Sequence, residues 1–158
     1  MSEPFTHLDP AGKARMVDVS GKQVTVRTAT AEGLVRCPAS VVALLRSGDV
    51  PKGDVLAVAR IAGIAAVKQT PMLLPLAHVI GIHGVVVDLE VTDEGVAVSA
   101  TVRTADRTGV EMEALTAVSV AALAVVDMVK GIDKAVEIAN VRLVAKSGGR
   151  SGDWHRED

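Results

Sequence analysis

The chain has 158 residues, a mass of 16.3 kDa and a formal net charge of −2 at pH 7. This length suits one domain, and we predict a single domain over residues 1–158 with a flexible, glycine-rich tail from about residue 147. Hydrophobic residues make up 49% of the chain but aromatic residues only 1%, namely Phe5 and Trp154. The weak charge and the scarcity of aromatic side chains exclude proteins that neutralise long polyanions or stack single-stranded bases, so no nucleic acid partner is expected.

The single cysteine and the distribution of charges indicate the compartment. Cys37 alone leaves no intrachain disulfide and no thiolate metal cluster, which suits the cytoplasm. The first residues show neither a basic region nor an apolar run, so no secretory signal is predicted. In the helix that we predict over residues 111–130, the stretch without charge covers residues 114–126 and is shorter than the roughly 18 residues of a membrane span. We therefore expect a cytoplasmic protein with no membrane partner.

The first half of the chain predicts one strand and two helices. Alternating residues with many β-branched side chains indicate a strand over residues 24–31. A short helix is expected to begin after Pro38 and to end at Gly48. The next helix is expected to begin at Asp54 and to end near Lys68, shortly before a proline.

Gly63, inside the second helix, indicates close packing against a neighbouring element. The second half of the chain predicts a hairpin, a helix and a last strand. β-Branched runs over residues 85–91 and 96–103 flank a turn. The helix over residues 111–130 is apolar nearly all round and should be buried in the core or between subunits, and a last strand covers residues 141–145. This order predicts an α+β fold, a ferredoxin-like sandwich whose antiparallel sheet carries helices on one face.

Charged side chains lie on the otherwise apolar helix predicted over residues 111–130. Asp127 and Lys130 share one face, and their spacing fits either an exposed ion pair or a proton-transfer pair with mutually perturbed pKa values. Glu113 lies 14 positions before Asp127, on nearly the same azimuth but about 21 Å away along a continuous helix. A single small site therefore cannot contain Glu113 and Asp127 of the same chain. Two copies of this helix, packed antiparallel about a two-fold axis, would bring Glu113 of one towards Asp127 of the other.

Other polar residues leave alternatives open. Lys52, between a proline and a glycine at a helix entry, suits a proton donor or an anion-binding group. The four histidines lack metal-ligand spacing, so no metal site is predicted, and His78 by itself fits a half-buried structural histidine. The tail over residues 147–153 fits an anion-binding nest or a flexible segment equally well.

Six segments resemble the cyclic pyranopterin monophosphate synthase family, which acts in molybdenum cofactor biosynthesis. They follow the family in collinear order over nearly the whole chain, and they read THLDPAGKARMVDVS, PKGDVLAVARIAGI, KQTPMLLPLAH, RTGVEMEALTAVSVAAL, DMVK and AKSGGRSGDW. The run TGVEMEALTAVSVAAL is long and specific.

The resemblance implies a homohexamer of ferredoxin-like subunits, a trimer of dimers, with active sites near the dimer interfaces. The implied reaction converts a small molecule, 3′,8-cyclo-7,8-dihydroguanosine 5′-triphosphate, to cyclic pyranopterin monophosphate and releases pyrophosphate. It implies catalytic roles for Asp127, Lys130 and Lys52. Substrate-binding roles are implied for Leu76, Ala77, His78, Glu111, Met112 and Glu113 and, at the triphosphate, for Lys22, Arg27, Lys68 and Lys146. No tightly bound cofactor is implied, although the triphosphate is a suitable ligand for Mg²⁺.

One segment departs from the family pattern. Residues 76–80 read LAHVI where the family usually has leucine, cysteine, histidine, proline and leucine. Loss of the proline frees the backbone beside the histidine. We expect an active lyase. The alternative is a catalytically weakened paralogue that acts as an oligomeric nucleotide- or pterin-binding protein. A third reading, a purely structural oligomer, would leave the charges on the helix over residues 111–130 without a function.

Overall fold

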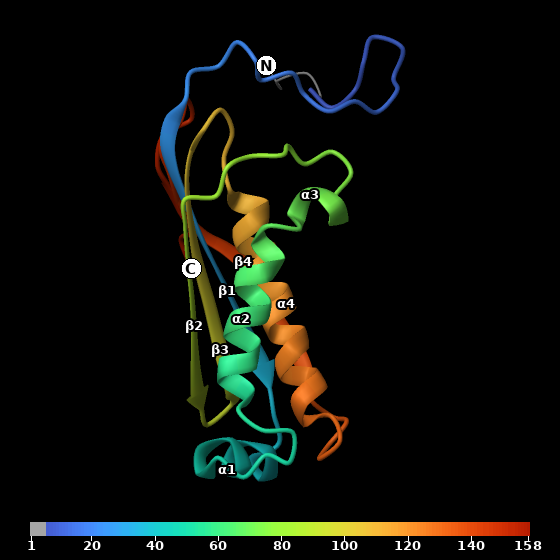
Figure 1. The fold of residues 1–158 in the computed structure, drawn as a ribbon, viewed down its shortest axis with the longest axis vertical. Coiled ribbons are helices and arrows are strands. Elements are labelled where there is room, and N and C mark those ends of the chain that lie inside the picture. The colour runs from blue at the N-terminus through green and yellow to red at the C-terminus, as the bar shows by residue number, and fades with distance from the viewer. Residues whose placement is uncertain (1–5) are drawn as a thin grey trace.

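The computed structural model describes residues 6–158 as one antiparallel sheet with the helices packed on one of its faces (Figure 1). The strands are β1 (Thr25–Arg36), β2 (Gly84–Thr92), β3 (Gly95–Asp106), β4 (Glu137–Ser147) and β5 (Trp154–His155). The helices are α1 (Ala39–Ser47), α2 (Val55–Val67), α3 (Thr70–Leu73) and α4 (Glu111–Val129). The sheet order is β2-β3-β1-β4-β5, and without the short β5 this is the order of a ferredoxin-like fold. The predicted fold class is confirmed.

The predicted ends of the first two helices are confirmed by their caps. Gly48 follows α1 with φ of 77°, and its N–H donates to the carbonyl of Leu44, which closes the helix. Asp54 precedes α2, and its side chain accepts a hydrogen bond from the N–H of Ala57 at 3.0 Å. These caps fix where α1 ends and α2 begins, and they leave Lys52 in the short loop between the two helices.

Small side chains let α2 and α4 pack side by side on the sheet (Figure 1). A Cβ atom placed on Gly63 of α2 would lie 3.0 Å from the carbonyl oxygen of Ala117 and 3.2 Å from the Cβ of Ala121, both on α4. The close packing predicted at Gly63 is confirmed. Of the two aromatic residues, Trp154 is on the surface, and Phe5 lies outside the described residues.

Gly63→Val is expected to reduce the free energy of unfolding by about 1–3 kcal/mol, because the added methyl groups would force α2 away from α4. Urea unfolding of wild type and variant measures this difference. Gly131→Val is the matched control, since a Cβ there meets nothing within 4 Å. Equal losses in the two variants would contradict the close contact.

α4 is the core helix of the domain. Its length and composition alone would allow it to cross a membrane, yet half of its most apolar stretch is buried inside the domain, where it packs on β1, β3 and α2. Its chain direction is opposite to that of α2 (Figure 1). The C-terminal end of α4 therefore lies beside the loop that enters α2, and its N-terminal end lies beside the exit from α2.

Candidate functional site

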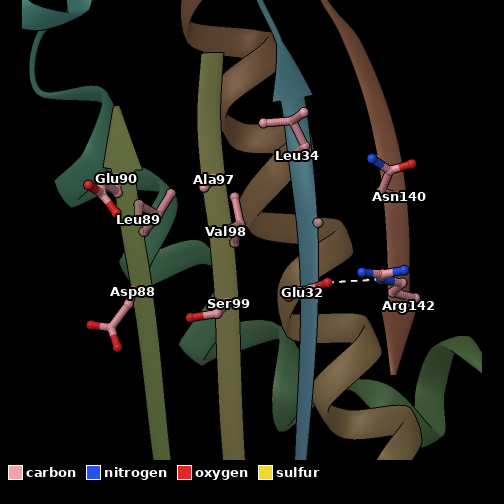
Figure 2. Close-up of a pocket in the computed structure, with 11 residues that line it drawn as sticks. Glu32, Leu34, Asp88, Leu89, Glu90, Ala97, Val98, Ser99, Asn140 and Arg142 are labelled. Carbon is pink, nitrogen blue, oxygen red and sulfur yellow. Dashed lines mark hydrogen bonds and ion pairs between the residues drawn. The ribbon is translucent and has the colours of Figure 1, made fainter. Parts of the chain in front are cut away.

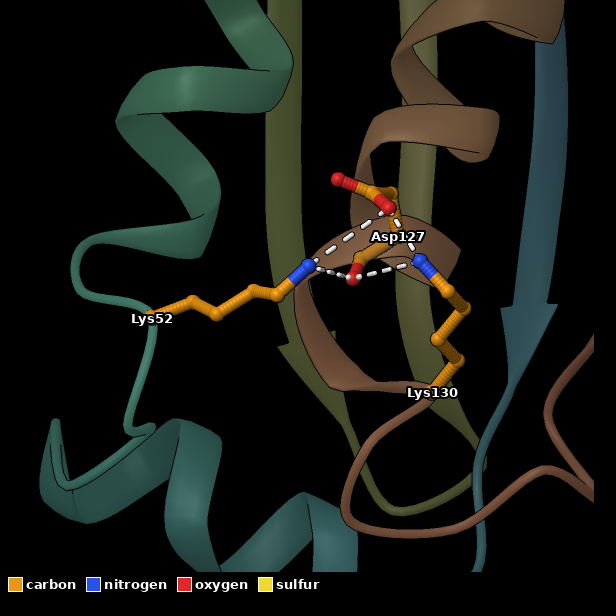
Figure 3. Close-up of polar contacts among 3 residues, drawn as sticks. All are labelled: Lys52, Asp127 and Lys130. Atoms are coloured by element: carbon orange, nitrogen blue, oxygen red, sulfur yellow. Dashed lines mark hydrogen bonds and ion pairs between the residues drawn. The ribbon is translucent and has the colours of Figure 1, made fainter.

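Asp127, near the C-terminal end of α4, is contacted by two lysines from different elements (Figure 3). Lys130 follows the same helix, and its Nζ donates to Oδ1 of Asp127. Lys52 comes from the loop before α2, and its Nζ donates to the backbone carbonyl of Asp127 at 2.9 Å and lies 3.5 Å from Oδ1. We call Lys52, Asp127 and Lys130 the lysine–aspartate cluster.

The lysine–aspartate cluster carries two positive charges and one negative charge, and its side chains are half exposed or more. The hydrogen bond and charge of Lys130, followed by the charge of Lys52, hold the pKa of Asp127 below its ordinary value. The carboxylate is therefore ionised at neutral pH. An ionised carboxylate between two ammonium groups can exchange protons with a bound molecule, and the excess positive charge favours an anionic one.

A second group of ionisable residues lies at the opposite end of α4. Glu111, in the first turn, pairs through Oε1 with the Nζ of Lys146 on β4 at 3.0 Å, and this Nζ also donates to Oγ of Ser151 in the tail at 3.0 Å. Glu113 lies two residues further along the helix, and it is only 4% exposed. We call Arg27, His78, Glu111, Glu113 and Lys146 the N-terminal cluster.

Glu113 is the buried acid of the N-terminal cluster. Burial raises the pKa of Glu113 above its ordinary value, and the nearby charge of Glu111 raises it further, while His78 acts in the opposite direction. A carboxyl group with a raised pKa keeps its proton closer to neutral pH. Glu113 is thus suited to donate a proton, whereas Asp127 is suited to accept one.

The free energy of unfolding of Glu113→Gln is expected to increase relative to that of wild type as the pH rises. The folded chain binds the Glu113 proton more tightly than the unfolded chain, so this residue lowers the free energy of unfolding as pH rises through the ordinary pKa of 4.5 towards the raised value. Glutamine has no such proton. Urea unfolding at pH 4 and pH 8 measures the effect, with Glu90→Gln on the exposed sheet face as control. A variant-to-wild-type difference that is the same at both pH values would contradict it.

His78 borders a cavity of about 610 Å³. Its Nε2 lies 2.5 Å from the backbone carbonyl of Val17. Because a carbonyl can only accept, Nε2 carries the hydrogen, and Nδ1 is the acceptor in the neutral ring. The cavity is lined by residues 16–20, His78 and Arg107. Its size suits a small organic molecule.

The guanidinium of Arg27 is held by uncharged acceptors, so its positive charge is available to bind an anion. Nε donates to the carbonyl of Asp106 at 3.1 Å and Nη2 to the carbonyl of Arg107 at 3.3 Å, so neutral acceptors hold the guanidinium in place. Within residues 6–158, no carboxylate forms an ion pair with it. The glycine-rich tail lies directly against it, because a Cβ on Gly149 would lie 2.0 Å from Nη1.

The structure separates the residues implied by the resemblance into these two clusters, at opposite ends of α4. Glu113 and Asp127 are 14 positions apart on one helix, hence about 21 Å. Five further residues lie outside the side-chain contacts described above: Lys22, Lys68, Leu76, Ala77 and Met112. Leu76 and Met112 are 38% and 44% exposed, and Lys68 lies at the exit from α2.

Sequence reasoning missed three parts of the N-terminal end. Arg107 and residues 16–20 line the cavity beside His78, and Ser151 binds Lys146. Residues 16–20 had no clear periodicity, and only their place in a segment that resembles the family marked them. Arg107 and Ser151 also lie in segments that resemble the family, but nothing in the sequence assigned them a role, because only the fold brings the end of β3 and the tail to this site.

A second cavity, of about 540 Å³, lies on the open face of the sheet (Figure 2). Its polar lining includes Glu32, Asp88 and Glu90, and its cation, Arg142, is paired with Glu32 at 2.8 Å. The surplus of carboxylates is unfavourable for a triphosphate. None of the residues predicted for the site lies in this cavity.

The match to a family profile decides the family. The profile of the MoaC family covers residues 16–149. The chain belongs to the MoaC family. The predicted family is thus confirmed. As a separate observation, residues 6–158 contain no group of three His, Cys, Asp or Glu side chains that could hold a metal ion.

Curated relatives in the MoaC family match over almost their whole length, and each is named cyclic pyranopterin monophosphate synthase. One from a Nocardioides species is 65% identical, covering 96% of this chain and 95% of the relative. One from Geobacter sulfurreducens is 54% identical over 98% of both chains. One from Chloroflexus aggregans is 52% identical, covering 99% of this chain and 96% of the relative.

Proposed function

We propose that this chain is a cyclic pyranopterin monophosphate synthase, a lyase of molybdenum cofactor biosynthesis. It would convert 3′,8-cyclo-7,8-dihydroguanosine 5′-triphosphate to cyclic pyranopterin monophosphate and pyrophosphate. The names of its relatives support this reaction. The observation that carries the proposal is the convergence of Lys52 and Lys130 on Asp127 in a member of this family.

The proposed reaction opens one ring, closes another and forms a cyclic phosphate, so it needs several proton transfers. The lysine–aspartate cluster supplies an ionised carboxylate and two ammonium groups within contact distance of each other. Glu113 supplies a carboxyl group whose pKa is raised by burial. Acids and bases with pKa values moved apart can drive successive proton transfers in one site.

Release of pyrophosphate requires positive charge around the leaving group. Arg27, held by backbone carbonyls, and Arg107, at the cavity beside His78, are the cations best placed for it. Lys146 is held against Glu111. Lys22 shortly precedes β1, and Lys68 follows α2, so we assign both to the same end of the domain. No tightly bound cofactor is needed for this chemistry, and Mg²⁺ would enter with the triphosphate as part of the substrate.

A complete site in this proposal uses two chains, because each chain carries its two clusters about 21 Å apart. Antiparallel packing of two α4 helices would place the lysine–aspartate cluster of one chain beside the partner subunit's Glu113. Exposed apolar side chains on α2 and α4 support such a contact: Val58 and Ile61 are 44% and 69% exposed, and Leu123 is 56% exposed. We infer a homohexamer built as a trimer of these dimers, in the cytoplasm.

The test supplies the cyclised GTP substrate to purified protein and follows pyrophosphate together with the fluorescent oxidised pterin. Formation of both products supports the proposal. Tight binding of the substrate without product would instead support the weakened, binding-only paralogue. The departure of residues 76–80 from the family pattern is the observation that suggests this alternative. Absence of both binding and product would overturn both functions.

A further inference from the structure

The segment that carries His78 is tied to the sheet through Gly81. Residues 78–83 form neither helix nor strand, and Val79 is 86% exposed. Both backbone groups of Gly81 are bound by the end of β3. Its N–H donates to Oδ2 of Asp106 at 3.0 Å, and its carbonyl accepts a hydrogen bond from the buried hydroxyl of Thr104.

Asp106 also touches the anion-binding side of the site. Its Oδ1 accepts the N–H of Arg107 at 2.7 Å, and its backbone carbonyl accepts Nε of Arg27 at 3.1 Å. The hydrogen bonds from Gly81 and Arg107 lower the pKa of Asp106, so the side chain stays an ionised acceptor. One residue at the end of β3 therefore binds the His78 segment with its side chain and Arg27 with its main chain.

We propose that Asp106 is a positioning residue that fixes the His78 segment relative to Arg27. On the proposed function, on which this inference rests, it sets the distance between the group that meets the substrate's ring system and the group that meets its triphosphate. Displacements of about 1 Å in such an arrangement cost up to roughly 100-fold in rate. Thr104 is the second anchor of the same segment, through its hydroxyl.

The two roles of Asp106 can be separated, because alanine removes its carboxylate and keeps its carbonyl. In Asp106→Ala we expect faster hydrogen–deuterium exchange in peptides that cover residues 78–84 and a kcat/KM lower by about 10- to 100-fold. Affinity for inorganic pyrophosphate, measured by calorimetry, should not fall, since the carbonyl still holds Arg27 and the variant removes a negative charge beside the anion. Asp88→Asn, on the open face of the neighbouring strand, is the control and should change none of these values.

Thr104 offers a matched pair of variants. Thr104→Val keeps the shape and loses the hydroxyl, and it should reproduce the faster exchange; Thr104→Ser keeps the hydroxyl and should behave as wild type. This pair decides the case if Asp106→Ala folds poorly.

Unchanged exchange of residues 78–84 in both Asp106→Ala and Thr104→Val overturns the inference. Faster exchange with an unaltered kcat/KM also overturns it, as does a parallel loss of pyrophosphate affinity, which would show collapse of the whole site. If wild type makes no product, the proposed function fails, and the positioning role is then judged by affinity for the cyclised GTP substrate against affinity for pyrophosphate. Loss of the first alone in Asp106→Ala supports the role, and equal affinities in wild type and variant overturn it.

Discussion

Asp127→Asn is expected to lower kcat on the cyclised GTP substrate by on the order of 10²–10⁴-fold, the usual contribution of a general acid or base. The amide keeps the shape of the side chain but cannot accept a proton or balance the charges of Lys52 and Lys130. The thermal midpoint should stay nearly the same, because exposed ion pairs contribute little to stability. Steady-state pterin fluorescence and a thermal melt measure the two quantities.

Two further variants make this result specific. Lys52→Met removes the ammonium group and retains the apolar stem, and it should also reduce kcat with the assembly mass unchanged. Asp133→Asn makes the same change of charge just beyond α4, where the aspartate only accepts a hydrogen bond from Ala135, and it should leave kcat at the wild-type level. If Asp127→Asn kept wild-type turnover, the lysine–aspartate cluster would be an ordinary surface ion pair.

Ile61→Glu is expected to break the dimer and, with it, the activity. Ile61 is 69% exposed on α2 and belongs to the apolar face that we assign to the subunit contact. A carboxylate buried there on both sides of a two-fold axis is strongly unfavourable, and association should weaken on the order of 10²-fold or more. Analytical ultracentrifugation and turnover at low protein concentration measure the two losses together.

Ile61→Leu is the matched control, because it keeps the apolar side chain and should retain both mass and turnover. Within Ile61→Glu, turnover should recover as the protein concentration is raised, since mass action restores the dimer. A monomeric variant with full turnover would show that one chain holds a complete site and would overturn the shared-site proposal.

Local signals predicted most of the fold. The glycine after α1 and the aspartate before α2 gave the helix ends, and alternation gave the strands. Strand lengths were underestimated, since β1 was expected to end at Ala31 and continues to Arg36. The continuation includes Gly33, where a Cβ would lie 2.8 Å from the side chain of Val118 on α4. The strand continues because residues 32–36 pair with residues 95–99 of β3, and no local pattern shows this pairing.

Two short elements were missed for related reasons. Pro71 indicated the end of a helix, yet it stands in the first turn of α3, where a proline is tolerated. β5 is two residues long and pairs with β4, and Arg156 holds it by donating through Nε to the carbonyl of Leu143 at 2.7 Å. Such a short strand depends on partners that are distant in the sequence.

The site was predictable in part. Helical spacing placed Asp127 beside Lys130 and far from Glu113, and both statements are confirmed. Lys52 is 75 residues from Asp127 in the sequence, so its contact with Asp127 depends on the antiparallel packing of α2 and α4. The position of Lys52 at a helix entry marked it as a candidate, but only the family resemblance placed it in one site with Asp127. The anchors on Gly81 were missed because they link β3 to a segment without regular structure.

If two chains complete one site, a mixture of two inactive variants should regain activity. Asp127→Asn lacks the carboxylate of the lysine–aspartate cluster, and Glu113→Gln lacks the buried acid at the other end of α4. When the two are unfolded together and refolded, half of the dimers are mixed, and each mixed dimer has one intact site. We expect recovery of about one quarter of wild-type turnover. No recovery, with mixed assemblies demonstrated by capture through an affinity tag carried on only one of the two variants, would contradict it.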